Sequence, residues 1–124
     1  MFDHISIGVS DLAKTKAFYD AALAPLGYRC LRDTPEMLGY GRDEVGLWIT
    51  PSEHPVPADM SSGLHFCFAA TSRKSVDEFH AQALRTGGRD NGEPGLRPEY
   101  DASYYAAFVT DPDGYRLEAY YGGA

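Results

Sequence analysis

The sequence contains few cysteines, no long apolar run and a deficit of basic residues. Of 124 residues only Cys30 and Cys67 are cysteines, too few for a disulfide framework. No apolar run approaches the ~20 residues that a membrane-spanning helix needs. No charged stretch leading into an apolar run marks an export signal after Met1. These absences exclude a disulfide scaffold, argue against a membrane protein and predict a cytoplasmic location.

The charge balance restricts the partners. Eighteen acidic residues against eleven basic residues give a net charge of −7. Such a surplus repels phosphate backbones and argues against sequence-independent binding of nucleic acid. The predicted partner is therefore a small molecule, either neutral or bridged to the protein by a metal. We expect one domain over residues 1–124, because a chain of this length buries a sufficient core without staples.

Two halves of the chain echo each other at a fixed offset. His4 and His65 occupy the same place in the two halves, 61 residues apart. The same offset relates four apolar pairs, which are Ile5 and Phe66, Ile7 and Phe68, Phe18 and Phe79, and Leu23 and Leu84. A fixed period of this kind is typical of two stacked copies of one supersecondary unit. The echo predicts that the two histidines meet near a pseudo-twofold axis.

Periodicity and turn signals predict the same element order in both halves. The first half, about 1–52, contains a strand at 2–9, a helix that follows the N-caps Ser10 and Asp11, and strands at 28–32, 37–40 and 45–50. A proline-containing linker follows at about 51–63. The second half, about 64–124, contains a strand at 64–69, a helix opened by Ser72 or Ser75, a polar loop at 89–103, and strands at 104–110 and 115–121. A short strand within the loop, around 96–99, would complete an α+β fold of two βαβββ modules.

Period-two alternation also predicts which strand face lines a cavity. The apolar face of each strand is expected to meet its helix, which leaves the other face open. The residues predicted on the open face are His4, Ser6, Trp48, His65, Cys67, Glu118 and Tyr120. Two imidazoles and one carboxylate are a ligand set for Fe(II), Mn(II) or Zn(II) that leaves coordination positions open. We therefore predict a metal site at His4, His65 and Glu118.

Other residues are candidates for substrate contact. Tyr100, Tyr104 and Tyr105 are predicted to orient a substrate through their phenols. Tyr104 and Tyr105 point oppositely, however, so at least one of these two is expected to be a structural strand residue. Trp48 is either a space-filling residue or an aromatic wall for a flat ligand. Cys67 faces the cavity, where inert packing is expected. His80, on a helix, is expected to be solvated.

Five stretches carry a resemblance to a known family. They are 2–7, 10–12, 18–19, 63–66 and 111–118, and the last, which runs from Asp-Pro-Asp-Gly to a glutamate, is the most specific. With these stretches the chain resembles the vicinal oxygen chelate superfamily of glyoxalases, extradiol dioxygenases and bleomycin resistance proteins. The resemblance implies paired modules that form a U-shaped half-barrel sheet with helices outside, usually as a homodimer.

The resemblance also implies a ligand set. His4, His65 and Glu118 match three metal-ligand positions of the family, whereas Trp48 stands where glyoxalase I has a fourth, carboxylate ligand. An indole cannot bind a metal through a lone pair. This departure weakens a glyoxalase I assignment and leaves a three-ligand set closer to that of extradiol dioxygenases.

The implied function is divalent-metal chemistry on a small substrate. An ion, Zn, Fe, Mn or Ni, would bind two adjacent substrate oxygens and act as a Lewis acid, in a lyase, isomerase or dioxygenase. With the fourth carboxylate absent, proton transfer falls to Glu118 or to a tyrosine such as Tyr105. The alternative is a metal-free binding or resistance protein of the bleomycin-resistance type, to which Trp48 and the tyrosines are suited.

Overall fold

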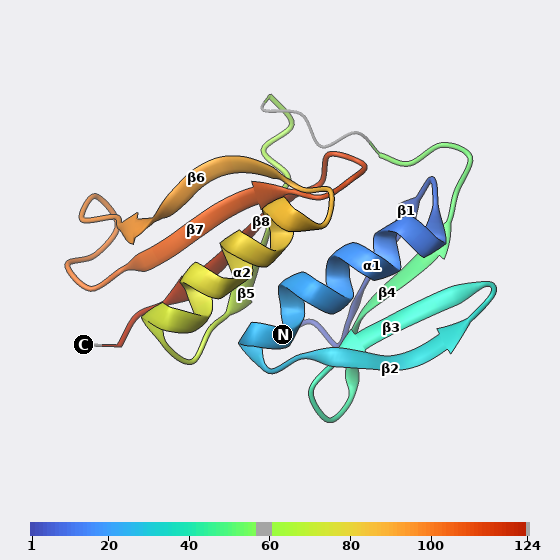
Figure 1. Ribbon diagram of the computed structural model, residues 1–124, viewed down its shortest axis with the longest axis horizontal. Coiled ribbons are helices and arrows are strands. Elements are labelled where there is room, and N and C mark those ends of the chain that lie inside the picture. The colour runs from blue at the N-terminus through green and yellow to red at the C-terminus, as the bar shows by residue number, and fades with distance from the viewer. Residues whose placement is uncertain (57–60, 124) are drawn as a thin grey trace.

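The computed structural model describes residues 1–56 and 61–123 and confirms the predicted α+β fold of two βαβββ modules (Figure 1). Module one contains β1 (Ile5–Val9), α1 (Leu12–Leu23), a 3₁₀ turn (Ala24–Leu26), β2 (Arg29–Thr34), β3 (Met37–Gly41) and β4 (Val45–Pro51). Module two contains β5 (Phe66–Ala69), α2 (Arg73–Arg85), β6 (Arg89–Leu96), β7 (Tyr105–Thr110) and β8 (Arg116–Tyr121). Part of the predicted linker, 57–60, lies outside the described residues.

The two modules share one topology. Their strand orders are β1-β4-β3-β2 and β5-β8-β7-β6, and among the described strands pairing occurs only inside each module. The first strand of each module, β1 or β5, pairs in parallel with the last strand of that module, β4 or β8. Ile5 therefore lies opposite Leu47, and Phe66 lies opposite Leu117. The predicted 61-residue offset between the halves is confirmed, because Ile5 and Phe66 occupy the same place in the two sheets.

One predicted segment and two predicted boundaries are wrong. The segment 89–103 is not a polar loop with a short strand at 96–99, because β6 runs from Arg89 to Leu96. Its glycines and Pro94 hide the period-two pattern, and its register against β7 shifts twice. Both first strands also begin later than predicted, so His4 and His65 each lie one residue before a strand.

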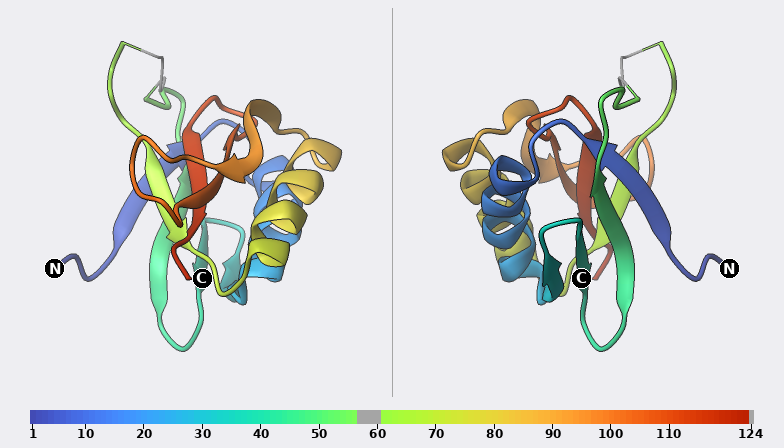
Figure 2. Two further views of the ribbon diagram at one scale, coloured as in Figure 1. Left: turned by 90° about the vertical axis from the view of Figure 1, so that its left-hand side faces the viewer. Right: turned by 90° about the vertical axis from the view of Figure 1, so that its right-hand side faces the viewer.

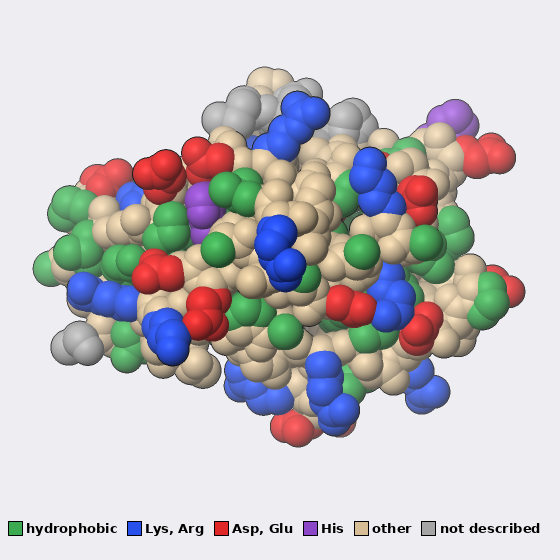
Figure 3. Space-filling model, in the orientation of Figure 1, with side chains coloured by type: hydrophobic (Ala, Val, Ile, Leu, Met, Phe, Trp, Pro, Cys, Tyr) green, Lys and Arg blue, Asp and Glu red, His purple; other side chains and the backbone are tan. Residues whose placement is uncertain are grey.

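The two helices lie side by side and cover one face of the sheets (Figures 1 and 2). Asp11 caps α1 by accepting from the backbone N–H of Lys14, and Ser72 caps α2 in a reciprocal box with Ser75. Acidic and basic side chains are interspersed over this helical face (Figure 3). No described helix is both long enough and apolar enough to span a membrane.

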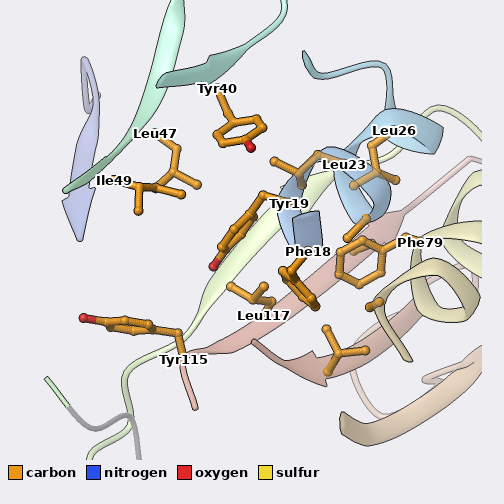
Figure 4. Close-up of a cluster of buried hydrophobic side chains, with 14 of the residues drawn as sticks. Phe18, Tyr19, Leu23, Leu26, Tyr40, Leu47, Ile49, Phe79, Tyr115 and Leu117 are labelled. Atoms are coloured by element: carbon orange, nitrogen blue, oxygen red, sulfur yellow. The ribbon is translucent and has the colours of Figure 1, made fainter. Parts of the chain in front are cut away.

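The main core is a single hydrophobic cluster, with aromatic rings near its centre, to which both modules contribute (Figure 4). Phe18 and Tyr19 of α1 are fully buried and pack edge to face, with ring centroids 4.9 Å apart. Tyr19 also packs against Tyr40 of β3, while Phe79 brings α2 into the same cluster. Burial of one such side chain contributes roughly 1.5–3 kcal/mol, so the helices of the two modules stabilise each other.

A buried carboxylate links the modules at the turn between β7 and β8. Asp111 is 3% exposed and accepts a hydrogen bond from the Tyr19 hydroxyl at 2.7 Å. Its other oxygen accepts from the backbone N–H groups of Asp113 and Tyr115. Burial raises the pKa of Asp111, while these three donors oppose that shift. The predicted tight turn at 111–114 is therefore also the contact that docks module two onto α1.

Two further contacts extend this docking to the end of β1. Asp113 accepts from both the backbone N–H and the hydroxyl of Ser10, the latter at 2.7 Å. The Tyr115 hydroxyl donates to the Gly8 carbonyl at 2.8 Å. The turn thus fixes where β8, which begins directly after it, stands relative to module one.

Removing the buried phenol should weaken the junction between the modules. We expect Tyr19→Phe to lower the free energy of unfolding by about 1–3 kcal/mol, because the buried Asp111 loses its hydroxyl donor. Urea denaturation followed by circular dichroism measures the change. Tyr28→Phe is the matched control, because its hydroxyl donates to the Ala69 carbonyl at an exposed site, and it should change the value by less than about 0.5 kcal/mol. Equal losses in the two variants would contradict this role of Asp111.

Candidate functional site

Glu118 is a buried carboxylate in the middle of β8. It lies opposite Cys67 of β5 and Phe108 of β7, and it is 3% exposed. Its neighbours Leu117 and Ala119 are buried in the core on the helix side. Strand alternation therefore places Glu118 on the face away from the helices, as the sequence predicts.

Both oxygens of Glu118 have partners. His65 Nε2 lies 3.1 Å from Oε1, and the Tyr104 hydroxyl donates to Oε2 at 2.5 Å. Burial, and then the hydrogen bond to Glu118, raises the pKa of Tyr104. The phenol therefore stays protonated at neutral pH and acts as a donor. The arrangement leaves Oε1, rather than Oε2, on the side of the half-exposed histidine.

The His65 and Glu118 pair fits a divalent ion as two of its ligands. Imidazole nitrogen and carboxylate oxygen bind such ions at about 2.0–2.2 Å, so two ligands at right angles lie about 3 Å apart. The observed separation of 3.1 Å matches that spacing. Across residues 1–56 and 61–123, however, no group of three His, Cys, Asp or Glu side chains could hold a metal. Within the described residues, His65 and Glu118 are thus the only two of the three predicted ligands that lie together.

The third predicted ligand, His4, does not join this pair within the chain. Its Nδ1 contacts the neighbouring Asp3 at 2.6 Å, and its side chain is 46% exposed. The N-terminal segment that carries it projects from the body of the molecule (Figure 2). His4 thus stands on module one, apart from the two ligand candidates of module two.

The tyrosines divide as their opposite directions predict. Tyr105 donates to Asp77 of α2 and lies under Arg73, so it faces the helix and the structure does not bring it to Glu118. Tyr104 faces the site, where its ring contacts Tyr100 at 5.1 Å and Tyr120 at 4.1 Å between centroids. The site therefore has an aromatic side built around Tyr104.

Cys67 and Trp48 have different surroundings. The protein atoms around Cys67, and then the charge of Glu118, raise the pKa of its thiol to about 12, so it is not a thiolate at neutral pH. Trp48 packs over Gly39 of β3, where an added Cβ would lie 2.8 Å from the indole ring. It fills space on the sheet of module one and lines neither cavity that His65 borders.

Two cavities meet at His65. The first, which we call the Glu118 cavity, has a volume of about 470 Å³, and its lining includes His65, Asn91, Tyr100, Tyr104, Phe108, Arg116 and Glu118. The second, the inter-module cavity, has about 490 Å³ and a mainly apolar lining that includes Ile5, Leu47, Phe66 and Phe68. The first has the polar groups and the size of a small-molecule site.

Sequence reasoning missed the surroundings of β6. His80 is not solvated as predicted, since it is 8% exposed and its Nε2 lies 2.9 Å from Asp90 Oδ1. Asn91, which lines the Glu118 cavity, was not a candidate. The run Asp90-Asn91-Gly92 is typical of a turn, and this signal concealed a bulged strand.

Comparison with known proteins identifies the family. The sequence pattern of the glyoxalase/bleomycin resistance protein/dioxygenase superfamily matches residues 1–119. Lactoylglutathione lyase of Arabidopsis thaliana is 30% identical over 94% of this chain and 42% of its own length. A glyoxalase/bleomycin resistance protein from Albidiferax ferrireducens has a TM-score of 0.82 and 32% identity, with 97% of each chain covered. The fosfomycin resistance protein of Listeria monocytogenes shares the fold, with a TM-score of 0.73 and 18% identity over 99% of this chain and 93% of its own.

The chain belongs to the glyoxalase/bleomycin resistance protein/dioxygenase superfamily. It is similar to lactoylglutathione lyase at a distance, and it spans less than half the length of that plant relative. The predicted family is thus confirmed, together with the fold that it implies.

The environment of Cys67 predicts that its thiol is alkylated slowly. In a Cys30→Ala background, iodoacetamide should alkylate Cys67 at pH 8 roughly ten- to a hundredfold more slowly than an ordinary thiol, because its raised pKa leaves little thiolate, an effect that the greater nucleophilicity of that thiolate offsets in part. Mass spectrometry over time gives the rate. Glu118→Gln should speed the reaction, since it removes the negative charge opposite the sulfur. Alkylation as fast as that of free cysteine would contradict the assigned environment.

Proposed function

We propose that this protein is a divalent-metal-dependent enzyme of the glyoxalase/dioxygenase type that acts on a small substrate with two adjacent oxygens. We further propose that two copies build each metal site, with His65 and Glu118 from one copy and His4 from the other. The observation that carries the proposal is the 3.1 Å approach of His65 to a buried Glu118 at the edge of a cavity. Two such ligands need a third to hold an ion as an open catalytic site.

The internal symmetry of the chain favours a second copy as the source of the third ligand. His4 occupies in module one the place that His65 occupies in module two, one residue before the outer strand. A twofold pairing of module one with module two of another copy brings each His4 to a partner's Glu118, twice per dimer. Phe2, beside His4, is 74% exposed, and burial of such apolar surface favours association.

The side chains around Glu118 have distinct roles in this proposal. A bound ion would polarise the two substrate oxygens as a Lewis acid. Tyr104 holds Glu118 Oε2 through its hydroxyl, which leaves Oε1 for the ligand position beside His65. The Tyr104 and Glu118 pair also holds a proton at the cavity wall, where it can be passed to or from a substrate atom. The reaction proposed is of the lyase, isomerase or dioxygenase type, and Trp48 in place of the fourth carboxylate would leave a bound ion with open positions.

A second candidate function is metal-free binding of a flat compound. The aromatic side of the site favours it, because Tyr100 is 65% exposed and packs edge-on against Tyr104. This candidate needs neither His4 nor a second copy at the Glu118 cavity. Metal uptake by the purified protein separates the two functions.

Loss of His65 should remove the metal and leave the fold. We expect His65→Ala to lose stoichiometric Zn²⁺ binding, measured by isothermal titration calorimetry, because half of the pair at Glu118 is gone. Its melting temperature should change little, since the histidine is exposed and the sheet forms without it. His54→Ala, an exposed histidine of the linker, is the matched control and should bind zinc as the wild type does. Unchanged zinc stoichiometry in His65→Ala would exclude this ligand assignment.

Complementation between two inactive variants tests whether copies share the site. His4→Ala and His65→Ala should each lose metal binding as pure proteins. Equal co-expression should restore about a quarter of the wild-type metal content, because half of the dimers are mixed and each mixed dimer has one intact site of two. A site built within one chain would give no restoration, and full metal binding by His4→Ala would remove His4 from the ligand set.

A further inference from the structure

The strand β6 carries a bulge that is fixed from the helix side. Asp90 pairs with Val109 and Gly92 with Phe108, so Asn91 is an extra residue in the strand. Asp90 Oδ1 lies 2.9 Å from Nε2 of the buried His80 and also accepts from the Gly92 backbone N–H at 3.0 Å. These contacts hold the pKa of Asp90 below its usual range. The bulge is therefore held in place by the contacts of Asp90 to His80 and Gly92.

The bulge places Asn91, a polar residue, in the lining of the Glu118 cavity. Asn91 and Gly92 together stand opposite Phe108, which lies beside Glu118 in the sheet. Asn91 lines the cavity, and its amide is exposed there rather than packed in the core. Bulges next to active sites commonly redirect a side chain in this way. The amide supplies both a donor and an acceptor at the β6 end of the cavity.

Arg97, which follows β6, lies against Phe108 of the cavity lining. The Arg97 guanidinium carbon lies over the face of Phe108, 5.4 Å from the ring centre, and one of its nitrogens donates to the Glu93 carbonyl at 2.7 Å. Two glycines leave the room that it occupies, because a Cβ on Gly92 or Gly95 would lie 3.4 or 3.2 Å from its nitrogens. The guanidinium is thus held over Phe108, a ring that lines the Glu118 cavity, and beside Gly92, the residue that follows Asn91.

We propose that the substrate of this site carries a carboxylate, which Arg97 and Asn91 bind at the β6 end of the Glu118 cavity. The inference rests on the proposed function in taking this cavity as the substrate site. Guanidinium and amide groups together match the geometry and charge of a carboxylate. In the proposed function the adjacent oxygens bind at the Glu118 end, which leaves the carboxylate for the opposite end of the ligand and of the cavity.

A matched pair of probes isolates the carboxylate. 3,4-Dihydroxybenzoate and 3,4-dihydroxybenzamide have the same ring, adjacent hydroxyls and nearly the same size, and they differ only in carrying a carboxylate or a neutral carboxamide. The wild type should bind the benzoate about tenfold more tightly by isothermal titration calorimetry. Arg97→Gln should bring the ratio close to one, Asn91→Ala should reduce it, and Arg97→Lys should keep part of it because the charge remains. Arg89→Gln, at the other end of β6, should keep the full preference.

The measurement is made with added Zn²⁺ and again with a chelator present. A benzoate preference that persists in chelator and depends on Arg97 supports the inference even if the metal proposal fails. Equal binding of the two probes, no binding of either, or a preference that survives Arg97→Gln would overturn it. A purely structural Arg97 would leave the ratio of the two affinities unchanged, and Arg97→Lys and Asn91→Ala decide the question if Arg97→Gln does not fold.

Discussion

The buried hydrogen bond between Tyr19 and Asp111 is the contact on which the arrangement of the modules depends. It joins residues 92 positions apart and sets the turn before β8 against α1. Because Asp111 is buried, it needs its three donors, and those donors come from both modules. Loss of this contact would weaken the junction, which the shared core and the contacts of Asp113 and Tyr115 to module one also hold.

This docking places the helices side by side and has a direct consequence for the site. His4 and His65 directly precede equivalent strands of separate sheets, yet in the described part of the chain no metal-binding group contains both. Module two holds His65, Glu118 and Tyr104 in mutual contact, whereas module one holds His4 with Asp3. A second copy is therefore the source that we propose for His4 at this site.

Much of the fold and part of the site could be predicted from local pattern. Period-two alternation places Glu118 on the face of Cys67 and His65, because the parallel register of β5 and β8 sets Cys67 opposite Glu118. The same alternation separates Tyr104 from Tyr105 but does not say which one faces the site. The strand β6 could not be predicted, because the bulge at Asn91 interrupts the period-two alternation. The contact between Asp90 and His80, which fixes the bulge, also joins two separate elements. The separation of His4 from Glu118 depends on how the modules dock, which no local pattern contains.

The central claim is that one ion lies between two copies of the chain. A crystal structure of zinc-loaded protein, with anomalous scattering measured at the zinc edge, tests it most directly. We predict one peak per chain, each bound by His65 and Glu118 of one subunit and by His4 of the partner subunit. A peak ligated by a single chain, or no peak at Glu118 in zinc-saturated crystals, would contradict the proposed site.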